Sequence, residues 1–376
     1  MVDISILWRR DAGTGIQRVV RALSEQMLQS DLGDYRLRFV AATRRKRYRY
    51  LEPDQDGKAD ALRIGKRIFA SRGDIFLGLD LSSRLLPRHG RQVRAWRRKG
   101  IRICIVVYDI LPAQHPEWFN NQQTDYFGRW LHFIGRHADQ LLCISKSVAQ
   151  DLSDWLQQQG YSDPQRTIDI CAFPLGGDLR QSRPSHGITD AETQALDNLA
   201  GRKVVLMVGT LEPRKGHAIA LNAFDRLLRD GLAESPALVI VGRKGWKSED
   251  VQERIRLHPH LNTDIFWFSD ASDELLYHLY QRCAGVFFPS FAEGFGLPVV
   301  EALSHARPVL TRNIPVFNEI SSSLITYFDR DDGVALAQSV TDWLKDIENE
   351  QKPCQQDALT WQKSCEALLR HLKILT

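Results

Sequence analysis

Short apolar runs alternate with helical stretches along the first half of the chain. The helical stretches are predicted over residues 16–29, 85–98, 117–136 and 147–159. The apolar and β-branched runs predict strands over residues 4–8, 37–41, 74–78, 103–108, 140–144 and 167–172. Because such alternation builds parallel sheets covered by helices, this half predicts a doubly wound α/β domain.

A polar stretch over residues 178–201, interpreted as a linker, interrupts the alternation, which then restarts. The α/β fold class is therefore expected to contain two Rossmann-like domains facing a cleft, where ligands bind at the carboxyl ends of the strands. The predicted domains are residues 1–174 and 175–350, followed by 351–376, whose helix can cross back to the N-terminal domain. Further strands are predicted over residues 203–208, 237–241, 264–268, 285–289, 308–311 and 324–328, with helices from residues 217, 247, 273, 298 and 333.

Composition excludes several classes of protein. With 376 residues, 43% of them hydrophobic and 26% charged, the chain is typical of a globular protein with more than one core. No apolar run approaches the roughly 18 residues that span a bilayer, and no signal peptide is expected. The six cysteines form no CxxC pair and no cluster with histidine. This favours reduced thiols in the cytoplasm over a structural zinc.

Charge separates the two halves of the chain. Residues 1–173 carry 28 Lys and Arg against 19 Asp and Glu, whereas the whole chain has a net charge of only +4. Basic residues gather at 44–49 and 88–102, near Tyr48, Tyr50 and Trp96. These stretches are typical of a surface that contacts an anionic membrane or nucleic acid, or of a solvated helix face. Since nothing nearby resembles a nucleic-acid module, peripheral membrane contact is the functional interpretation that we favour.

One string carries the most chemical information: FFPSFAEGFGLPVVEAL, residues 287–303. A strand ends there, a turn with Gly294 and Gly296 follows, and a helix begins near Pro298. The glycines allow close approach of the backbone to a ligand, and the helix start offers unpaired N–H groups to a diphosphate. Glu293 and Glu301 can both border that ligand as acceptors for sugar hydroxyls. The alternative is a surface glutamate in a loop and a capping glutamate on a helix.

A second loop, between Gly209 and Gly216, carries two adjacent cations. Arg214 and Lys215 lie between a predicted strand end and a helix start, which suits an anionic phosphate. Read alone, they could equally be solvated charges.

The N-terminal half offers weaker candidates at its own strand ends. Gly13, Thr14 and Gly15 follow the first predicted strand, although a plain tight turn explains them as well. Tyr108 and Asp109 emerge from an apolar strand, where Asp109 either orients a substrate hydroxyl or caps the next turn. Ser145 opens a polar stretch, residues 145–147, before the next predicted helix, which Ser147 can cap.

The 287–303 string resembles the Glu-x7-Glu signature of glycosyltransferase family 4, whose members are retaining enzymes of the GT-B fold. The resemblance extends over most of the C-terminal domain, through residues 208–216, 238–242 and 272–284. It implies an N-terminal acceptor domain and a C-terminal donor domain. It also implies that Lys215, assisted by Arg214, binds the donor diphosphate, that Glu301 binds the ribose, and that Glu293 and Gly294 lie at the donor sugar. The backbone of Phe295, Gly296 and Leu297 is implied to contact sugar and phosphate, with Gly13, Thr14 and Gly15 near the phosphates. The residues implied on the acceptor side are Tyr108, Asp109 and Ser145.

Two positions depart from the family pattern. Thr210 stands where many members carry an arginine, and Tyr108 stands where many carry a histidine. Arg214 can take over the first charge. Catalytic roles are expected for Asp109, Glu293 and Lys215, and the Asp54-Gln55-Asp56 triplet is expected to be solvated and not to bind metal.

Residues 11–18 resemble mannosyl- and rhamnosyltransferases of bacterial lipopolysaccharide O-chains. This implies transfer from GDP-mannose, with GDP-rhamnose or a UDP-sugar as alternatives, onto a lipid-linked oligosaccharide or polysaccharide, without a cofactor or metal. The expected location is the cytoplasm, at the inner face of the plasma membrane. A NAD-dependent dehydrogenase is disfavoured, because Arg18 replaces the third glycine of its fingerprint. A non-catalytic scaffold that binds sugar nucleotides remains the other class.

Overall fold

The structure is a computed structural model that describes residues 1–53, 62–161, 167–178, 187–230, 236–349 and 359–375. The predicted Asp54–Asp56 loop and residues 351–358 of the third predicted segment lie outside these ranges. The chain forms two compact units. Unit 1 contains residues Met1–Pro116, Asn121–Gly176 and Thr360–Thr376, and unit 2 contains Glu117–Asn120 and Gly177–Leu359. The change of unit at Gly176 lies two residues beyond the predicted domain boundary.

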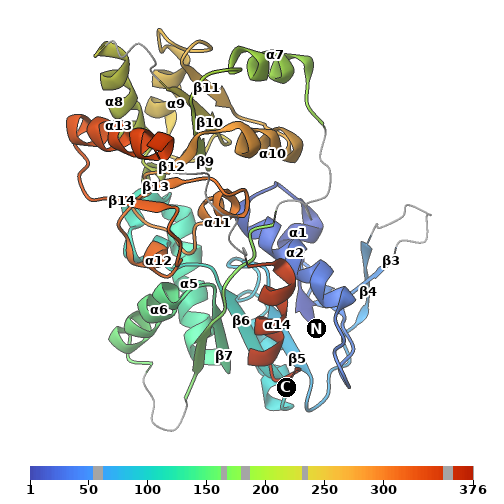
Figure 1. Cartoon of the computed structure of the whole chain (residues 1–376). Helices are drawn as coiled ribbons and strands as arrows, with labels where there is room; N and C mark the ends of the chain where they lie inside the picture. Colours follow the sequence, from blue (N-terminus) through green and yellow to red (C-terminus); the bar gives the residue numbers. More distant parts are fainter. Residues whose placement is uncertain (54–61, 162–166, 179–186, 231–235, 350–358, 376) are drawn as a thin grey trace. The chain divides into compact units, whose positions relative to one another are not determined.

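Unit 1 is built on a mixed sheet with the strand order β4-β3-β2-β1-β5-β6-β7-β8 in the described residues (Figure 1). Strands β2, β1, β5, β6, β7 and β8 run parallel to one another, whereas the pairs β2–β3 and β3–β4 are antiparallel. The strands are β1 (Val2–Asp3), β2 (Phe39–Ala41), β3 (Arg49–Pro53), β4 (Leu62–Arg67), β5 (Ile75–Gly78), β6 (Arg102–Val107), β7 (Gln140–Cys143) and β8 (Asp169–Ala172).

The helices of unit 1 bury their apolar faces against this sheet. Trp130 and Leu131 of α5 and Leu152 of α6 belong to a core shared with Ile105 and Leu141 of the central strands. The helices are α1 (Ser5–Arg9), α2 (Gly15–Gln29), α3 (Gly90–Arg98), α4 (Leu111–Gln114), α5 (Asn121–His137), α6 (Lys146–Gln158) and α14 (Trp361–His371).

The first predicted strand, residues 4–8, is wrong: only Val2–Asp3 pairs in the sheet, and Ser5–Arg9 is helical. The Asp80 carboxylate accepts hydrogen bonds from the backbone N–H groups of Ile6 and Leu7, at 2.7 and 2.8 Å. This carboxylate satisfies donors that a helix start leaves unpaired, so a distant residue overrides the local strand preference. The β3–β4 hairpin was not predicted either, because basic residues occupy much of this edge.

Unit 2 contains a second sheet whose described strands are all parallel, in the order β11-β10-β9-β12-β13-β14 (Figure 1). All six predicted strands are present within two residues of their predicted ends, so the α/β class with two parallel-sheet domains is confirmed. They are β9 (Val204–Val208), β10 (Ala237–Val241), β11 (Ile265–Phe268), β12 (Gly285–Phe288), β13 (Val309–Arg312) and β14 (Ile325–Phe328).

The strand order of unit 2 reverses between β9 and β12, so the loops after these two strands lie at a topological switch point, the usual ligand site of such sheets. The predicted linker contains an additional helix, α7, which begins with a capping box between Thr189 and Glu192. The helices are α7 (Asp190–Asn198), α8 (His217–Arg229), α9 (Glu249–Arg256), α10 (Asp273–Arg282), α11 (Leu297–Ser304), α12 (Pro315–Asn318) and α13 (Gly333–Asn349).

The C-terminal helix α14 packs in unit 1 against α2 (Figure 1). Gln140 Nε2 donates a hydrogen bond to the His371 carbonyl at 2.9 Å, and His371 Nε2 lies 3.1 Å from the Ala172 carbonyl. The predicted return of this helix to the N-terminal domain therefore agrees with these contacts. Within the described ranges, no helix is both long and apolar enough to cross a membrane.

Candidate active site

The loop after β9 brings two cations to the switch point of unit 2. The chain turns through Gly209 (φ 152°), forms a short 3-10 helix over Pro213–Lys215, and turns again at Gly216 (φ 73°) before α8. A Cβ at Gly216 would lie 2.4 Å from the Pro289 carbonyl oxygen, at the end of β12. Only glycine fits this left-handed, close-packed position, and the loop is thereby held against the neighbouring strand end.

Glu293 joins the two cations in one buried cluster. Lys215 Nζ lies 2.5 Å from Glu293 Oε1, and Arg214 Nη1 lies 2.9 Å from Glu293 Oε2. Arg214 Nε donates to Glu212 Oε2 at 2.9 Å. The structure therefore brings together the three residues that the two motifs singled out, and adds Glu212. Both oxygens of Glu293 are bound by cations, an arrangement that aligns Arg214 and Lys215 side by side.

Burial and charge act in opposite directions on this cluster. Burial alone would raise the pKa of Glu293, but Lys215 and Arg214 outweigh it and lower that pKa to about 2. Burial lowers the pKa of Lys215, against the attraction of Glu293. Burial raises the pKa of Glu212, and Arg214 opposes that effect. Glu293 is thus ionised throughout the physiological range, and its charge supports the protonated form of the lysine.

The turn from Gly294 to Leu297 leads directly into α11. Gly296 caps the helix with φ 93°, and a Cβ there would lie 2.5 Å from the ring of Phe317. The first turn of α11 therefore begins at a fixed point, with the unpaired N–H groups that favour an anion. Glu301, further along α11, is 2% exposed and accepts a hydrogen bond from the Tyr280 hydroxyl at 3.0 Å.

Three polar residues of this region were missed as site components. Glu212 and Tyr280 fix Arg214 and Glu301, and nothing in their local pattern distinguishes them from surface residues. His217, which was not selected, is buried at the start of α8. Neither of its ring nitrogens has a hydrogen-bond partner within the described residues. Burial and nearby Lys215 lower its pKa to about 3, so the imidazole is neutral.

The Gly13–Gly15 segment in unit 1 forms a capping turn. Gly13 has φ 62°, and its N–H donates to Asp11 Oδ1 at 2.9 Å. Thr14 caps α2 through a reciprocal hydrogen-bond pattern with Gln17. This geometry matches the tight-turn alternative, and a role of the segment near donor phosphates stays a prediction.

The three acceptor-side candidates have structural partners of their own. The Tyr108 hydroxyl donates to the Leu79 carbonyl at 2.7 Å and is buried. Asp109 Oδ1 accepts from the Leu111 N–H at 3.2 Å, and Ser145 Oγ accepts from the Val148 N–H at 3.1 Å. The Asp109 contact is the cap that the sequence left open as an alternative. The cap of α6 comes from Ser145 and not from Ser147, the capping residue that the sequence suggested. Acceptor binding by these residues stays a prediction.

Unit 1 also buries a carboxylate pair that the sequence did not reveal. Asp3 accepts hydrogen bonds from the hydroxyls of Ser5, Tyr48 and Ser82, at 2.5, 2.9 and 2.8 Å. Asp80 lies next to it at the start of α1. Burial, and then the charge of Asp3, raise the pKa of Asp80 to about 7.

Comparisons with known proteins agree with this geometry. Residues 189–359 match the family model described as glycosyl transferases group 1. The chain is 38% identical over 382 residues to the serotype-specific mannosyltransferase WbdA of Escherichia coli, covering 100% of this chain and 46% of that protein. It is 30% identical over 230 residues to the O-antigen chain mannosyltransferase RfbU of Salmonella typhimurium, covering 61% and 57%. The chain thus spans about half the length of these curated relatives.

The structure of Anabaena Alr3699/HepE, solved with UDP and glucose, aligns with a TM-score of 0.54. The identity is 17%, over 80% of this chain and 75% of that one. The fold is therefore that of the GT-B glycosyltransferases, as the sequence predicted. Residues 189–359, which match the glycosyl transferases group 1 model, contain the Arg214–Lys215–Glu293 cluster.

Proposed function

We propose that this chain transfers a hexose, with mannose as first choice, from a nucleotide diphosphate sugar to a glycan hydroxyl in O-chain synthesis. The observation that carries the proposal is the buried pair of cations, Arg214 and Lys215, aligned by Glu293 beside the start of α11. Similarity of the whole chain to 46% of a named mannosyltransferase supports the choice of sugar. The acceptor that we propose is a lipid-linked oligosaccharide or a growing polysaccharide.

Stabilising the departing diphosphate is the main chemical task. Lys215 uses one of its three N–H donors on Glu293, so the same ammonium can also donate to a phosphate oxygen. Arg214 and the first turn of α11 add fixed positive groups, which stabilise developing negative charge without reorganising. We propose that this replaces a metal ion, so that a chelator leaves the turnover rate unchanged.

Glu293 fits a positioning role better than a nucleophilic one. Its two oxygens each bind a cation, and its pKa of about 2 makes it a weak base. We therefore propose retention through a front-face step, in which the leaving phosphate helps to deprotonate the acceptor. Glu301, held by Tyr280, is proposed to bind the ribose hydroxyls.

The donor is proposed to be GDP-mannose, because the named relatives are mannosyltransferases. GDP-rhamnose and UDP-sugars are the alternatives, and the solved neighbour was crystallised with UDP. The excess of basic residues in the first half of the chain supports a location at the cytoplasmic face of an anionic membrane.

Titration calorimetry with GDP, UDP, dTDP, ADP and NAD tests the donor site. We expect GDP to bind, and Lys215→Met and Glu301→Gln to weaken that binding at least tenfold. The control Glu253→Gln alters an exposed glutamate on α9 and should bind as the wild type does. Binding of UDP but not of GDP would indicate that the donor is a UDP-sugar instead of GDP-mannose. Binding without turnover of GDP-mannose would favour the scaffold, and binding of no nucleotide would refute the donor site.

A further inference from the structure

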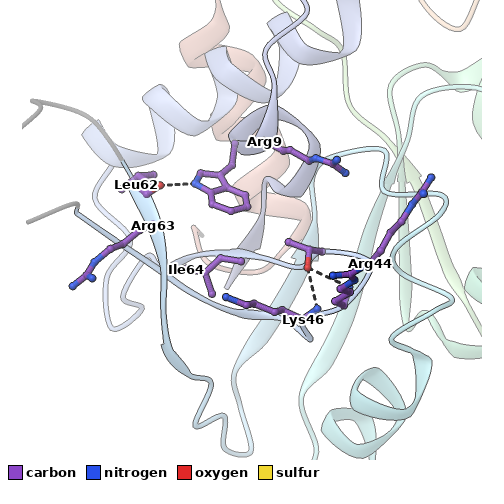
Figure 2. A pocket seen from close by; sticks show the side chains of 9 residues that line it. Arg9, Arg44, Lys46, Leu62, Arg63 and Ile64 are labelled. Atoms are coloured by element: carbon purple, nitrogen blue, oxygen red, sulfur yellow. Dashed lines mark hydrogen bonds between the residues drawn. The ribbon is translucent and has the colours of Figure 1, made fainter. Parts of the chain in front are cut away.

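A pocket of about 640 Å³ lies within unit 1 (Figure 2). Its volume is in the range of pockets that hold small ligands. Three segments line it: residues 8–9 of α1, residues 43–46 after β2, and residues 62–64 of β4. The first two segments follow the carboxyl ends of the parallel strands β1 and β2, which is the edge where ligands of this fold bind.

The charge of the lining is uniformly positive. As far as the structure describes it, the lining contains no carboxylate, and none of its charged side chains takes part in an ion pair with another described residue. Like charges repel, so this cluster is stabilised when an anion lies among them. Figure 2 shows Arg9, Arg44, Lys46 and Arg63 around the pocket, and Arg45 is the fifth cation of the lining.

Apart from Thr43, the remaining lining is apolar, and hydrogen bonds hold parts of it in place. The indole N–H of Trp8 donates to the Leu62 carbonyl at 2.6 Å, which fixes the aromatic ring against the edge strand (Figure 2). Thr43 Oγ1 accepts from the N–H groups of Arg45 and Lys46, at 3.3 and 2.9 Å, and so shapes the cationic loop. A flat aromatic wall beside five cations matches a ligand with several negative charges on an apolar or sugar body.

We propose that this pocket binds the diphosphate of a lipid diphosphate, the carrier on which the acceptor glycan is presented. The identity of the ligand as an acceptor carrier rests on the proposed function. The anion site itself rests on the lining of the pocket. It contains no residue of the Arg214–Lys215 cluster, which belongs to unit 2.

Calorimetric titration of the full chain with inorganic pyrophosphate and with geranyl diphosphate tests the pocket. The triple variant Arg44→Gln/Arg45→Gln/Lys46→Gln should weaken both ligands by about tenfold or more. The control Arg91→Gln/Arg98→Gln/Lys99→Gln removes the same charge from exposed positions at α3 and should leave both affinities unchanged. Trp8→Phe should weaken geranyl diphosphate more than pyrophosphate.

Three results would overturn the proposal. Equal weakening in the pocket and control variants would indicate only the general positive field of the surface. Loss in Lys215→Met, with the pocket variant unchanged, would place the anion in the donor site. Binding only to vesicles of phosphatidylcholine with one-fifth phosphatidylglycerol, and to neither soluble ligand, would indicate a membrane surface instead of a pocket.

Nucleotide binding separates this proposal from the proposed function. The pocket variant should bind GDP as the wild type does, which also shows that it is folded. A chain that binds geranyl diphosphate through the pocket but binds no nucleotide would refute the proposed function and leave the anion site standing.

Discussion

Each unit buries a pair of carboxylates after the carboxyl ends of its parallel strands, Asp3 and Asp80 in unit 1 and Glu212 and Glu293 in unit 2. The two pairs have different partners. In unit 1, hydroxyls and backbone N–H groups bind Asp3 and Asp80, and the pKa of Asp80 rises to about 7. In unit 2, Arg214 and Lys215 bind Glu293, whose pKa falls to about 2. Asp80 and Glu293 are both buried, so the two cations on Glu293 account for the opposite direction of its pKa shift; for Glu212, with Arg214 as its partner, burial still prevails and raises the pKa.

The difference separates structure from chemistry. The partners of Asp3 and Asp80 are hydroxyls and backbone N–H groups, and these hydrogen bonds tie the strand ends to the start of α1. The partners of Glu293 are cations that can also donate to a phosphate. A buried acidic pair is therefore not by itself a sign of an active site. Its cationic partners are the better sign.

The largest expected effect comes from breaking the unit 2 cluster. Lys215→Met leaves Glu293 with one cation and removes a donor to the leaving diphosphate. Turnover of GDP-mannose should fall by about 100-fold or more. The free energy of unfolding should fall by about 3 kcal/mol, because a buried charge loses a partner. Activity assays and urea unfolding measure the two losses.

Lys345→Met is the control for this change, because it removes an exposed lysine from α13. It should alter neither quantity. A loss of stability in Lys215→Met without a loss of turnover would show that the unit 2 cluster is structural, as we argue for the pair in unit 1.

A smaller loss is expected when the loop beside the cluster is displaced. Gly296→Ala forces a side chain into a left-handed conformation and against Phe317, at a cost of about 1–3 kcal/mol. GDP affinity should fall as well. Gly128→Ala, where a Cβ meets nothing within 4 Å on α5, should keep or slightly raise the melting temperature. Equal behaviour of the two variants would contradict the fixed geometry of the turn.

Two serines that cap helices test whether the polar residue after a strand of unit 1 stabilises the fold or binds the acceptor. Ser145→Ala should cost about 1 kcal/mol and leave turnover unchanged, if its hydroxyl only caps α6. Ser272→Ala removes the equivalent cap of α10 in unit 2 and should cost the same. A selective fall of turnover in Ser145→Ala would restore the predicted contact with the acceptor.

The smallest change is expected at Asp80, where pH gives the clearest measurement. The native carboxyl keeps its proton up to about pH 7, whereas its ordinary pKa is 3.8. The native state therefore binds more protons between these values, and the free energy of unfolding falls as pH rises from about 4 to about 7.

Asp80→Asn should flatten this pH slope. At pH 5 it should change stability by no more than about 1 kcal/mol, since an amide oxygen can also accept from Ile6 and Leu7. Denaturant titrations at several pH values measure the slope, with the exposed Asp270→Asn as control. An unchanged slope would mean that Asp80 is ionised in the native state, and the contrast between the units would weaken.

The fold was predictable where strands are buried on both faces. Strands β9 and β10 of unit 2 are continuous apolar runs, which hydrophobicity alone detects, whereas β13 and β14 also contain Thr311, Arg312 and Thr326. Residues 5–9 were not predictable, because the carboxylate that caps their helix lies 74 residues away in the sequence. The hairpin β3–β4 has a basic edge strand, in which charged side chains conceal the strand pattern. Helix α7 had a readable local signal, the capping box at Thr189 and Glu192.

The candidate site was predictable in its parts but not in its connections. Spacing placed Lys215 and Glu293 at neighbouring strand ends, and they meet there. It could not show that Glu293 binds both cations, because side-chain direction depends on packing. For the same reason, the sequence could not predict that the Tyr108 hydroxyl donates to the Leu79 carbonyl.

The return of α14 to unit 1 sets an order of events during synthesis. Residues 1–176 leave the ribosome long before residues 360–375 exist, by roughly 10–40 s at ordinary translation rates. Until then the surface of α2 that packs on Cys365, and the carbonyl-binding amide of Gln140, await their partners. Of the two units, unit 1 therefore begins to be translated first but receives its last helix only after unit 2 has been made.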